Sequence, residues 1–378
     1  MHTDYKIGVI GLGHWFNRLN VGMQMVGGLS LAKAMGTKPY EEKRELLSGF
    51  KLGKEDYYIT DETGHIPEGF FDGIDVVHVS DPNSLHALQT EESLLNGKYV
   101  VTEKSFATTE GEFERISSMI KRGNYEDKAY LHLHYLHKQP TLILKAMLPG
   151  LVKRHGKIKN VSATFFEREN EEDARRGKWL FSLRNGGIFM DWIHPFEILY
   201  YATESDFDGI RELKEYSVNY ETVNPTGIKA TINVGGKYYL KDASATISVA
   251  KGVGEKEESK SIRIEFDSGS YATLGYVGSE IEFKSDDRGM LEIGEVKNGK
   301  NRIMMASRLQ GPNSSEIFVD EIIGLCNGEN TGLTMDEVSA IFKPQWEYQK
   351  LTGSGGLIKE RDKIDMFVKD GISSAGGK

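Results

Sequence analysis

The sequence predicts an α/β fold: an N-terminal doubly wound parallel sheet, followed by an α+β domain with a large open, mostly antiparallel sheet. Short apolar runs alternate with helical patterns through the first 135 residues, every second residue is apolar in several stretches after residue 155, and helical patterns return near the end. A chain of 378 residues is long enough for two or three domains. We assign residues 1–135 to the first domain, 136–353 to the second and 354–378 to a C-terminal arm or tail.

The composition argues against several classes of protein. Lys and Arg total 47 against 56 Asp and Glu, and the resulting net charge of −9 opposes binding to nucleic acid or to an anionic membrane surface. No apolar run reaches the length of about 18 residues that a membrane-spanning helix needs, and Met1 to Asp4 do not begin a signal peptide. The single cysteine, Cys326, allows no internal disulfide. We therefore expect a soluble cytoplasmic protein.

The first domain contains predicted strands and helices in alternation. Buried strands are expected at residues 7–10, 29–35, 74–79 and 99–102. A helix capped by Ser84 and ended by Gly97 separates the last two strands, and another starts at Thr109 with a capping box to Glu112. This alternation favours a parallel sheet with helices on both faces.

The second domain has the alternating pattern of antiparallel strands with one wet face. The alternating segments are residues 161–165, 243–249 and 262–266. We expect a turn at Val234–Lys237, and a solvated hairpin tip at Glu255–Lys260. Helices are expected around 187–201 and 318–325, and from 335 after a Thr334/Glu337 capping box.

A glycine-rich turn follows the first predicted strand. Gly11 suits a tight turn from strand to helix, and Gly13 lets a pyrophosphate approach the helix N-terminus. Phe16 stands where a third glycine is usual. We predict that this turn, with His14, Trp15 and Phe16, binds a dinucleotide.

The end of the second strand favours NADP over NAD. An acidic residue there would hold the ribose 2′-hydroxyl of NAD, whereas Gly36 is followed by Thr37 and Lys38, which suit a 2′-phosphate. Glu41 and Glu42 lie close by, so NAD stays the alternative, with Lys38 then a solvated loop charge.

Two further motifs follow predicted strands at their carboxyl ends, where ligands bind in open α/β sheets. They are Ser80–His86 and Thr102–Ser105. The expected cofactor contacts are Ser80, Pro82, Asn83, His86, Glu103 and Lys104. Taken singly, Asn83 and His86 are also explained as a helix cap and a surface residue. The charge of Lys104 can orient a substrate.

A predicted helix in the second domain carries a candidate acid/base pair. Asp191 and His194 are three residues apart, so they share one helix face among apolar neighbours. Such a pair suits proton transfer near neutral pH, although a buried structural hydrogen bond would look the same.

Two other clusters have simpler explanations. His132, His134 and His137 have no carboxylate or cysteine at a recognisable spacing, so we expect no metal site. The charged run from Glu169 to Lys178 is interpreted as a solvated loop, with a lid as the alternative.

Together and in order, these segments resemble the glucose–fructose oxidoreductase/inositol dehydrogenase family of sugar oxidoreductases. The matching stretches are the opening glycine turn, 74–86, 97–104 with its Glu103-Lys104 pair, and 186–194. The resemblance implies a Rossmann domain that binds NAD(H) or NADP(H), and an open-sheet domain that contacts substrate and often forms an oligomer interface. It implies that Lys104, Asp191 and His194 are catalytic and bind substrate. Tyr135 and Trp179 fall in stretches that often line the family's sugar pocket.

These observations predict an NADP-preferring oxidoreductase that transfers hydride between a sugar, polyol or related cyclic hydroxyl compound and the nicotinamide. The expected partners are a small-molecule substrate and further copies of the chain, as a homodimer or homotetramer. The alternatives are a non-catalytic NADP-binding sensor or regulatory protein, and a reductase of a non-sugar carbonyl.

Overall fold

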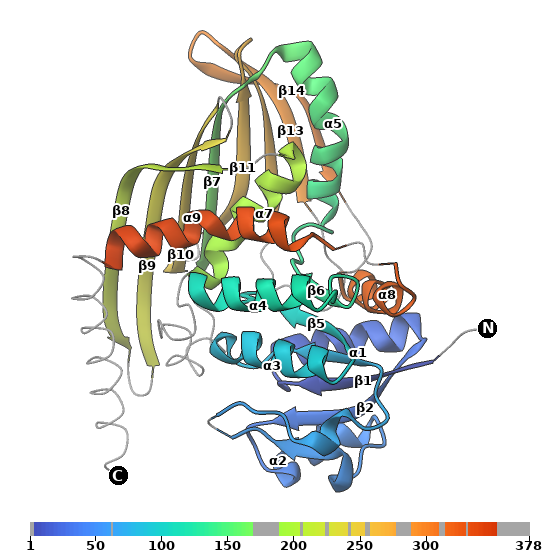
Figure 1. The fold of residues 1–378 in the computed structure, drawn as a ribbon. Coiled ribbons are helices and arrows are strands. Elements are labelled where there is room, and N and C mark those ends of the chain that lie inside the picture. The colour runs from blue at the N-terminus through green and yellow to red at the C-terminus, as the bar shows by residue number, and fades with distance from the viewer. Residues whose placement is uncertain are drawn as a thin grey trace. The chain divides into compact units, whose positions relative to one another are not determined.

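A computed structural model describes most of the chain (Figure 1). The described residues are 4–61, 63–168, 189–204, 207–223, 227–240, 243–253, 258–276, 289–309, 314–329 and 332–353. The chain forms two compact units, residues 1–134 with 313–338, and 135–312 with 339–378. Residues 313–338, which the sequence analysis assigns to the second domain, therefore belong to the first unit. The expected arm at 354–378 lies outside the described residues.

The first unit contains a six-stranded parallel sheet in the order β3-β2-β1-β4-β5-β6. The strands are β1 (Tyr5–Ile10), β2 (Leu29–Gly36), β3 (Tyr57–Ile59), β4 (Val76–Val79), β5 (Tyr99–Glu103) and β6 (Ala129–His132). The strand order reverses between β1 and β4, and the carboxyl ends of the strands at such a point form the ligand crevice of doubly wound sheets. The predicted Rossmann topology is confirmed.

Helices pack on both faces of this sheet. They are α1 (His14–Val26), α2 (Tyr40–Ser48), α3 (Asn83–Leu95), α4 (Glu110–Arg122) and α8 (Ser314–Cys326), with 3-10 turns at Lys54–Asp56 and Glu68–Phe71. On β5 the Thr102 hydroxyl meets Thr90 of α3 at 2.7 Å, whereas Glu103 reaches the opposite face, below α8. α8 lies against α1, where a side chain on Gly22 would meet the Ser315 carbonyl.

The helix starts show which caps form. The capping box from Thr109 to Glu112 is present, and so is the one from Thr334 to Glu337. α3 begins one residue before the predicted cap Ser84, because Pro82 takes the N-cap position.

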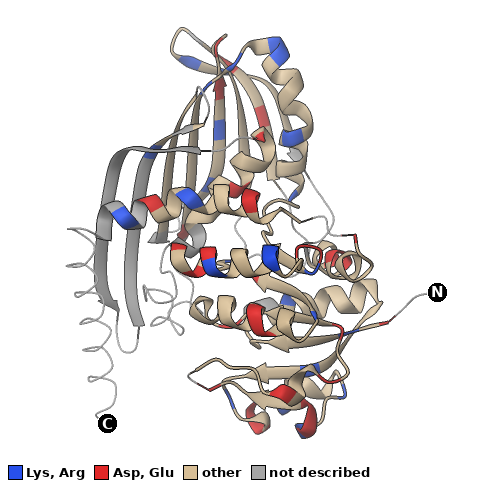
Figure 2. Cartoon of the chain, in the orientation of Figure 1, with Lys and Arg blue, Asp and Glu red and all other residues tan. Residues whose placement is uncertain are grey.

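Charges of both signs lie along α4 and α9 (Met335–Gly353), as Figure 2 shows.

The second unit contains an eight-stranded sheet in the order β14-β13-β12-β11-β7-β10-β9-β8. The strands are β7 (Ile158–Arg168), β8 (Phe207–Val223), β9 (Gly227–Leu240), β10 (Ala243–Val253), β11 (Ser259–Phe266), β12 (Ser270–Tyr276), β13 (Gly289–Lys297) and β14 (Lys300–Leu309). All neighbouring pairs are antiparallel except β7 with β10. Helices α5 (Gln139–His155) and α7 (Phe189–Thr203) pack together and on this sheet. The predicted mostly antiparallel sheet is confirmed.

Two predicted turns are wrong. Val234–Lys237 lies inside β9, where Gly236 pairs with Ile247 of β10 along an unbroken ladder. The expected hairpin at Glu255–Lys260 does not form either, because β10 and β11 both pair with β7 and lie on either side of it. Lys260 belongs to β11, where its buried ammonium is balanced by the Glu167 carboxylate at 2.5 Å. None of the described helices is both long and apolar enough to cross a membrane.

Candidate functional site

The turn after β1 is joined to its neighbours at the point where the strand order reverses. Gly11 has φ +92°, and a Cβ there would lie 2.5 Å from the Ser80 carbonyl oxygen in the turn after β4. The Ser80 hydroxyl donates to the carbonyls of Ile10 (3.0 Å) and Gly11 (2.9 Å). The Gly11 amide donates to Met35 of β2 at 2.9 Å. Glycine is therefore required at position 11 by both the backbone angle and the close approach of the two turns.

The N-terminus of α1 is open toward an anion. Gly13 is its N-cap residue, no side chain caps the helix and its first turn holds no acidic residue. A Cβ built on Gly13 meets no described atom within 4 Å. Amides and helix dipole together suit a pyrophosphate here. His14 and Trp15 begin α1, although their side chains lie outside the described residues.

Phe16 does not face this opening. Its side chain is fully buried in the core, with its ring 5.5 Å from that of Phe50. The phenylalanine that replaces the third glycine therefore packs between α1 and the rest of the unit, and only its backbone is available to a cofactor.

Thr37 and Lys38 are exposed beyond the end of β2, as expected for a group that contacts the distal ribose. The Tyr57 hydroxyl donates to the Lys38 carbonyl at 2.5 Å and fixes the turn. The Lys38 ammonium lies 3.9 Å from Glu42, and the exposure of both side chains makes this a weak pair. Glu41 is engaged by Lys54 at 2.9 Å, and this hydrogen bond lowers the pKa of Glu41.

The turn after β4 leads directly into α3. Ser80 and Pro82 are half-buried, and Asn83, the first residue of α3, is 6% exposed. His86 is 1% exposed, and both of its ring nitrogens contact backbone carbonyls of the protein. His86 therefore lies beneath the turn in this structure, and its expected contact with the cofactor stays a prediction.

Glu103 also turns away from the crevice. Its carboxylate is buried between His132 of β6, at 2.8 Å, and His78 of β4, at 3.3 Å. Burial opposes ionisation, but the two imidazoles outweigh it and lower the pKa of Glu103 to about 2. The His132 ring stacks on Phe318 of α8 with ring centroids 3.9 Å apart. Glu103 thus holds three strands and a helix together, and the sequence analysis missed its partner His78.

Lys104 follows Glu103 at the carboxyl edge of the sheet. It is half-buried, and a cis peptide bond joins it to the buried Ser105. One histidine of the sequence cluster, His132, binds Glu103. Among the described residues there is no His, Cys, Asp or Glu group with the arrangement of a metal site.

In the second unit, α7 presents a buried histidine with a carboxylate partner. His194 Nδ1 lies 3.1 Å from Glu197 Oε1, and both side chains are nearly inaccessible to solvent. The sequence analysis missed Glu197, although its spacing of three residues from His194 was a usable signal. Asp191 lies on the same helix, but its side chain is outside the described residues, as is Trp179 altogether.

Aromatic residues surround this histidine. The Tyr135 ring is 4.5 Å from the His194 ring, and Tyr135 is 2% exposed. Thr141 links the Tyr135 carbonyl (2.6 Å) to the Tyr276 hydroxyl (2.9 Å). Burial raises the pKa of Tyr276, so this hydroxyl stays neutral. The imidazole and its carboxylate partner therefore lie in a poorly solvated environment, where the hydrogen bond between them is stronger than it would be in water.

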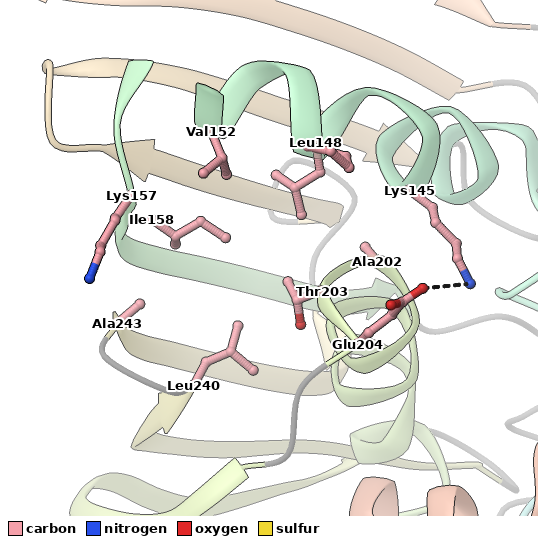
Figure 3. Close-up of a pocket in the computed structure, with 11 residues that line it drawn as sticks. Lys145, Leu148, Val152, Lys157, Ile158, Ala202, Thr203, Glu204, Leu240 and Ala243 are labelled. Carbon is pink, nitrogen blue, oxygen red and sulfur yellow. Dashed lines mark ion pairs between the residues drawn. The ribbon is translucent and has the colours of Figure 1, made fainter. Parts of the chain in front are cut away.

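A separate cleft of about 430 Å³ lies in the second unit between α5, the end of α7 and strands β7, β9 and β10 (Figure 3). Leu148, Val152, Ile158 and Leu240 make most of its wall apolar, and a Lys145–Glu204 pair at 3.7 Å stands at one side. None of the predicted site residues lines it.

The geometry so far defines a class of fold: a unit with a doubly wound parallel sheet, and a second unit with a large open sheet and a buried His194–Glu197 pair. No protein-family model matches the chain, and no curated protein matches it either. Solved structures do match along nearly the whole chain.

Three of these structures have TM-scores of 0.65 to 0.67. An aldose–aldose oxidoreductase from Caulobacter crescentus matches with TM-score 0.65 at 16% sequence identity. The match covers 92% of this chain and 97% of the oxidoreductase chain. A point mutant of the 3-ketoreductase KijD10 from Actinomadura kijaniata, in complex with TDP-benzene and NADP, matches with TM-score 0.67 at 14% sequence identity. The match covers 94% of this chain and 98% of the KijD10 chain. The WlbA dehydrogenase from Bordetella pertussis, in complex with NADH and UDP-GlcNAcA, matches with TM-score 0.65 at 14% sequence identity. The match covers 93% of this chain and 96% of the WlbA chain. The two-domain fold that the resemblance implies is confirmed.

Proposed function

We propose that the protein is an NADP-preferring oxidoreductase that transfers hydride between a sugar, polyol or related cyclic hydroxyl compound and the nicotinamide. The observation that carries this proposal is the open, uncapped N-terminus of α1 beside Gly11 and Gly13, at the point where strand order reverses. The shared fold adds support, because the matching structures are of oxidoreductases, in complexes that include NADP and NADH.

The cofactor would lie along the carboxyl edge of the first unit. Backbone amides of the Gly11–Phe16 turn would hold its pyrophosphate, and the turn of Ser80, Pro82 and Asn83 would contact its nicotinamide half. Thr37 and Lys38 would bind the 2′-phosphate, since both are exposed and the Lys38 pair with Glu42 is weak. When bound, the nicotinamide would supply hydride chemistry at its C4 atom.

His194 would transfer the proton of the substrate hydroxyl. Its Nδ1 atom is held by Glu197, so Nε2 is the atom that would take the proton of a substrate hydroxyl, or return it in the reverse direction. The Glu197 carboxylate stabilises the imidazolium that forms. Lys104 would orient the hydroxyl and stabilise developing negative charge, and Asp191 would hold a substrate hydroxyl. Tyr135, whose ring is 4.5 Å from the imidazole, would shape the substrate side of this group.

The same groups support the proposed substrate class. A histidine, an aspartate and a lysine are the hydrogen-bonding partners that a hydroxylated carbon compound needs. The matching structures are consistent with it, since they were solved with glycerol, TDP-benzene or UDP-GlcNAcA.

Self-association has its own support. Large apolar side chains are exposed on β13 and β14: Met290, Val296, Ile303, Met304 and Met305. Large apolar side chains exposed on neighbouring strands are a feature of interaction surfaces. The proposed homodimer or homotetramer is tested by light scattering of the purified protein.

The experiment that tests the function is a turnover screen with NADP, and separately with NAD, against sugars, polyols and cyclic hydroxyl compounds. Turnover that is faster with NADP supports the proposal. Tight cofactor binding without turnover of any of these compounds would contradict the substrate class and favour a sensor or a non-sugar carbonyl reductase.

A further inference from the structure

His86 bridges two turns of the first unit. Its Nδ1 atom lies 2.9 Å from the carbonyl oxygen of Ser105, the residue after Lys104. Its Nε2 atom lies 2.6 Å from the carbonyl oxygen of Asp81, in the turn that leads into α3. The ring is 1% exposed, so it has no contact with a ligand of its own.

Both contacts are to carbonyl oxygens, which only accept hydrogen bonds. A neutral imidazole has one N–H group and therefore donates to only one of the two turns at a time. An imidazolium has two N–H groups and can donate to both turns. Nearby carboxylates are those of Asp81 and Glu103, which favour the second proton, whereas burial disfavours it and lowers the pKa of His86. The Nδ1 contact reaches the carbonyl of the Ser105–Phe106 peptide, one residue after Lys104.

We infer that His86 is a positioning residue: it tethers the Ser105 carbonyl, one residue after Lys104, through Nδ1, and the Asp81 carbonyl through Nε2, donating to one of them when it carries one proton and to both when it carries two. This inference builds on the proposed function, in which Lys104 acts on substrate and the Asp81–Asn83 turn meets the cofactor. It assigns His86 to both parts of that site without contact to either ligand.

Two substitutions separate the two bonds. The amide nitrogen of asparagine replaces Nδ1, and that of glutamine replaces Nε2. His86→Asn thus keeps a donor for Ser105 and loses the one for Asp81, whereas His86→Gln does the reverse. His65, which is exposed and contacts Glu92 outside these turns, provides matched control variants with asparagine and glutamine.

The first readout is acylation of the Lys104 amine by N-hydroxysuccinimidyl acetate, followed by mass spectrometry with the exposed Lys51 as internal reference. We expect His86→Gln to raise the Lys104 rate by about fivefold, as a buried hydrogen bond is lost, and His86→Asn to leave it within about twofold. The second readout is NADPH affinity by fluorescence. Here His86→Asn raises the dissociation constant by about tenfold, and His86→Gln leaves it within about twofold.

Equal effects of both variants on Lys104 labelling would overturn the inference, since a residue that only fills space gives no such split. Labelling needs no cofactor, so it still tests the Nδ1 bond if the wild-type protein binds neither NADPH nor NADH, a result that would end the proposed function alone. If neither variant folds, ¹⁵N NMR of the wild-type His86 ring decides: a protonated Nδ1 supports the bond to Ser105, and a bare Nδ1 contradicts it.

Discussion

Replacing Glu103 with glutamine tests the buried carboxylate behind Lys104. The pKa of Glu103 falls from 4.5 to about 2 on folding, because His132 and His78 outweigh the effect of burial. A folded-state pKa below the unfolded value means that the ionised group stabilises the fold above about pH 4.5, and that this stability is lost as the pH falls toward 2. A shift of this size corresponds to about 3 kcal/mol.

The Glu103→Gln variant keeps the shape of the side chain and removes its charge. We expect its free energy of unfolding at pH 7 to be about 3 kcal/mol lower than that of the wild type, with the difference shrinking as the pH falls below 4.5. Urea unfolding followed by circular dichroism between pH 7 and pH 3 measures both quantities.

Thr102→Val is the matched control, since it removes a buried 2.7 Å hydrogen bond to Thr90 from the same strand without removing a charge. Its cost should be independent of pH. A Glu103→Gln difference that stays constant from pH 7 to pH 3, or that is absent at pH 7, would refute the assignment of an ionised carboxylate held by two imidazoles.

Other substitutions test the remaining groups. Lys104→Met and His194→Ala should each lower turnover by about 100-fold or more by steady-state kinetics, and His194→Ala should leave NADPH affinity, measured by fluorescence, unchanged. Glu197→Gln should lower kcat by about tenfold without changing KM, since the partner of His194 Nδ1 loses its charge; an unchanged kcat would remove Glu197 from the mechanism. Gly11→Ala should lower the melting temperature and abolish NADPH binding, because its Cβ would meet the Ser80 carbonyl at 2.5 Å. Lys145→Ala should change stability by under about 1 kcal/mol in urea unfolding, as its pair is partly exposed.

Much of the first unit could be predicted because its signals are local. The Gly11 turn and the Thr109–Glu112 capping box each depend on residues within a few positions of one another. Strand and helix alternation then determined the sheet. The return of α8 to this unit was not predictable in the same way, because Phe318 meets His132 across 186 positions of sequence (318 − 132).

Side-chain direction explains where the structure places Glu103 and His86, which the sequence analysis expects to contact the cofactor. Glu103 and Lys104 are neighbours in the sequence, but Glu103 is on the strand face that packs under α8, and its partner His78 comes from another strand. His86 lies one turn into α3, below the crevice that its motif borders. Which side of a strand or helix meets the ligand depends on packing, and one sequence shows only the alternation.

The second unit shows the same limit for topology. Alternating residues correctly indicated β11, with Ile262, Ile264 and Phe266 buried. The hairpin expected next to it was wrong because β7 inserts between β10 and β11, a pairing that joins segments about 90 residues apart in the sequence. Local turn signals cannot reveal such an insertion.

The most direct test of the central claim is a fluorescence titration with NADPH and NADH of the wild-type protein and of Gly13→Glu. A Cβ at position 13 meets no described atom within 4 Å, so we expect this variant to fold, but it places a carboxylate where the pyrophosphate would bind. We predict tight NADPH binding to the wild type, weaker NADH binding, and a loss of about 100-fold or more for NADPH in the variant. Equal NADPH affinity in the two proteins, or no binding of either nucleotide to the wild type, would contradict the account.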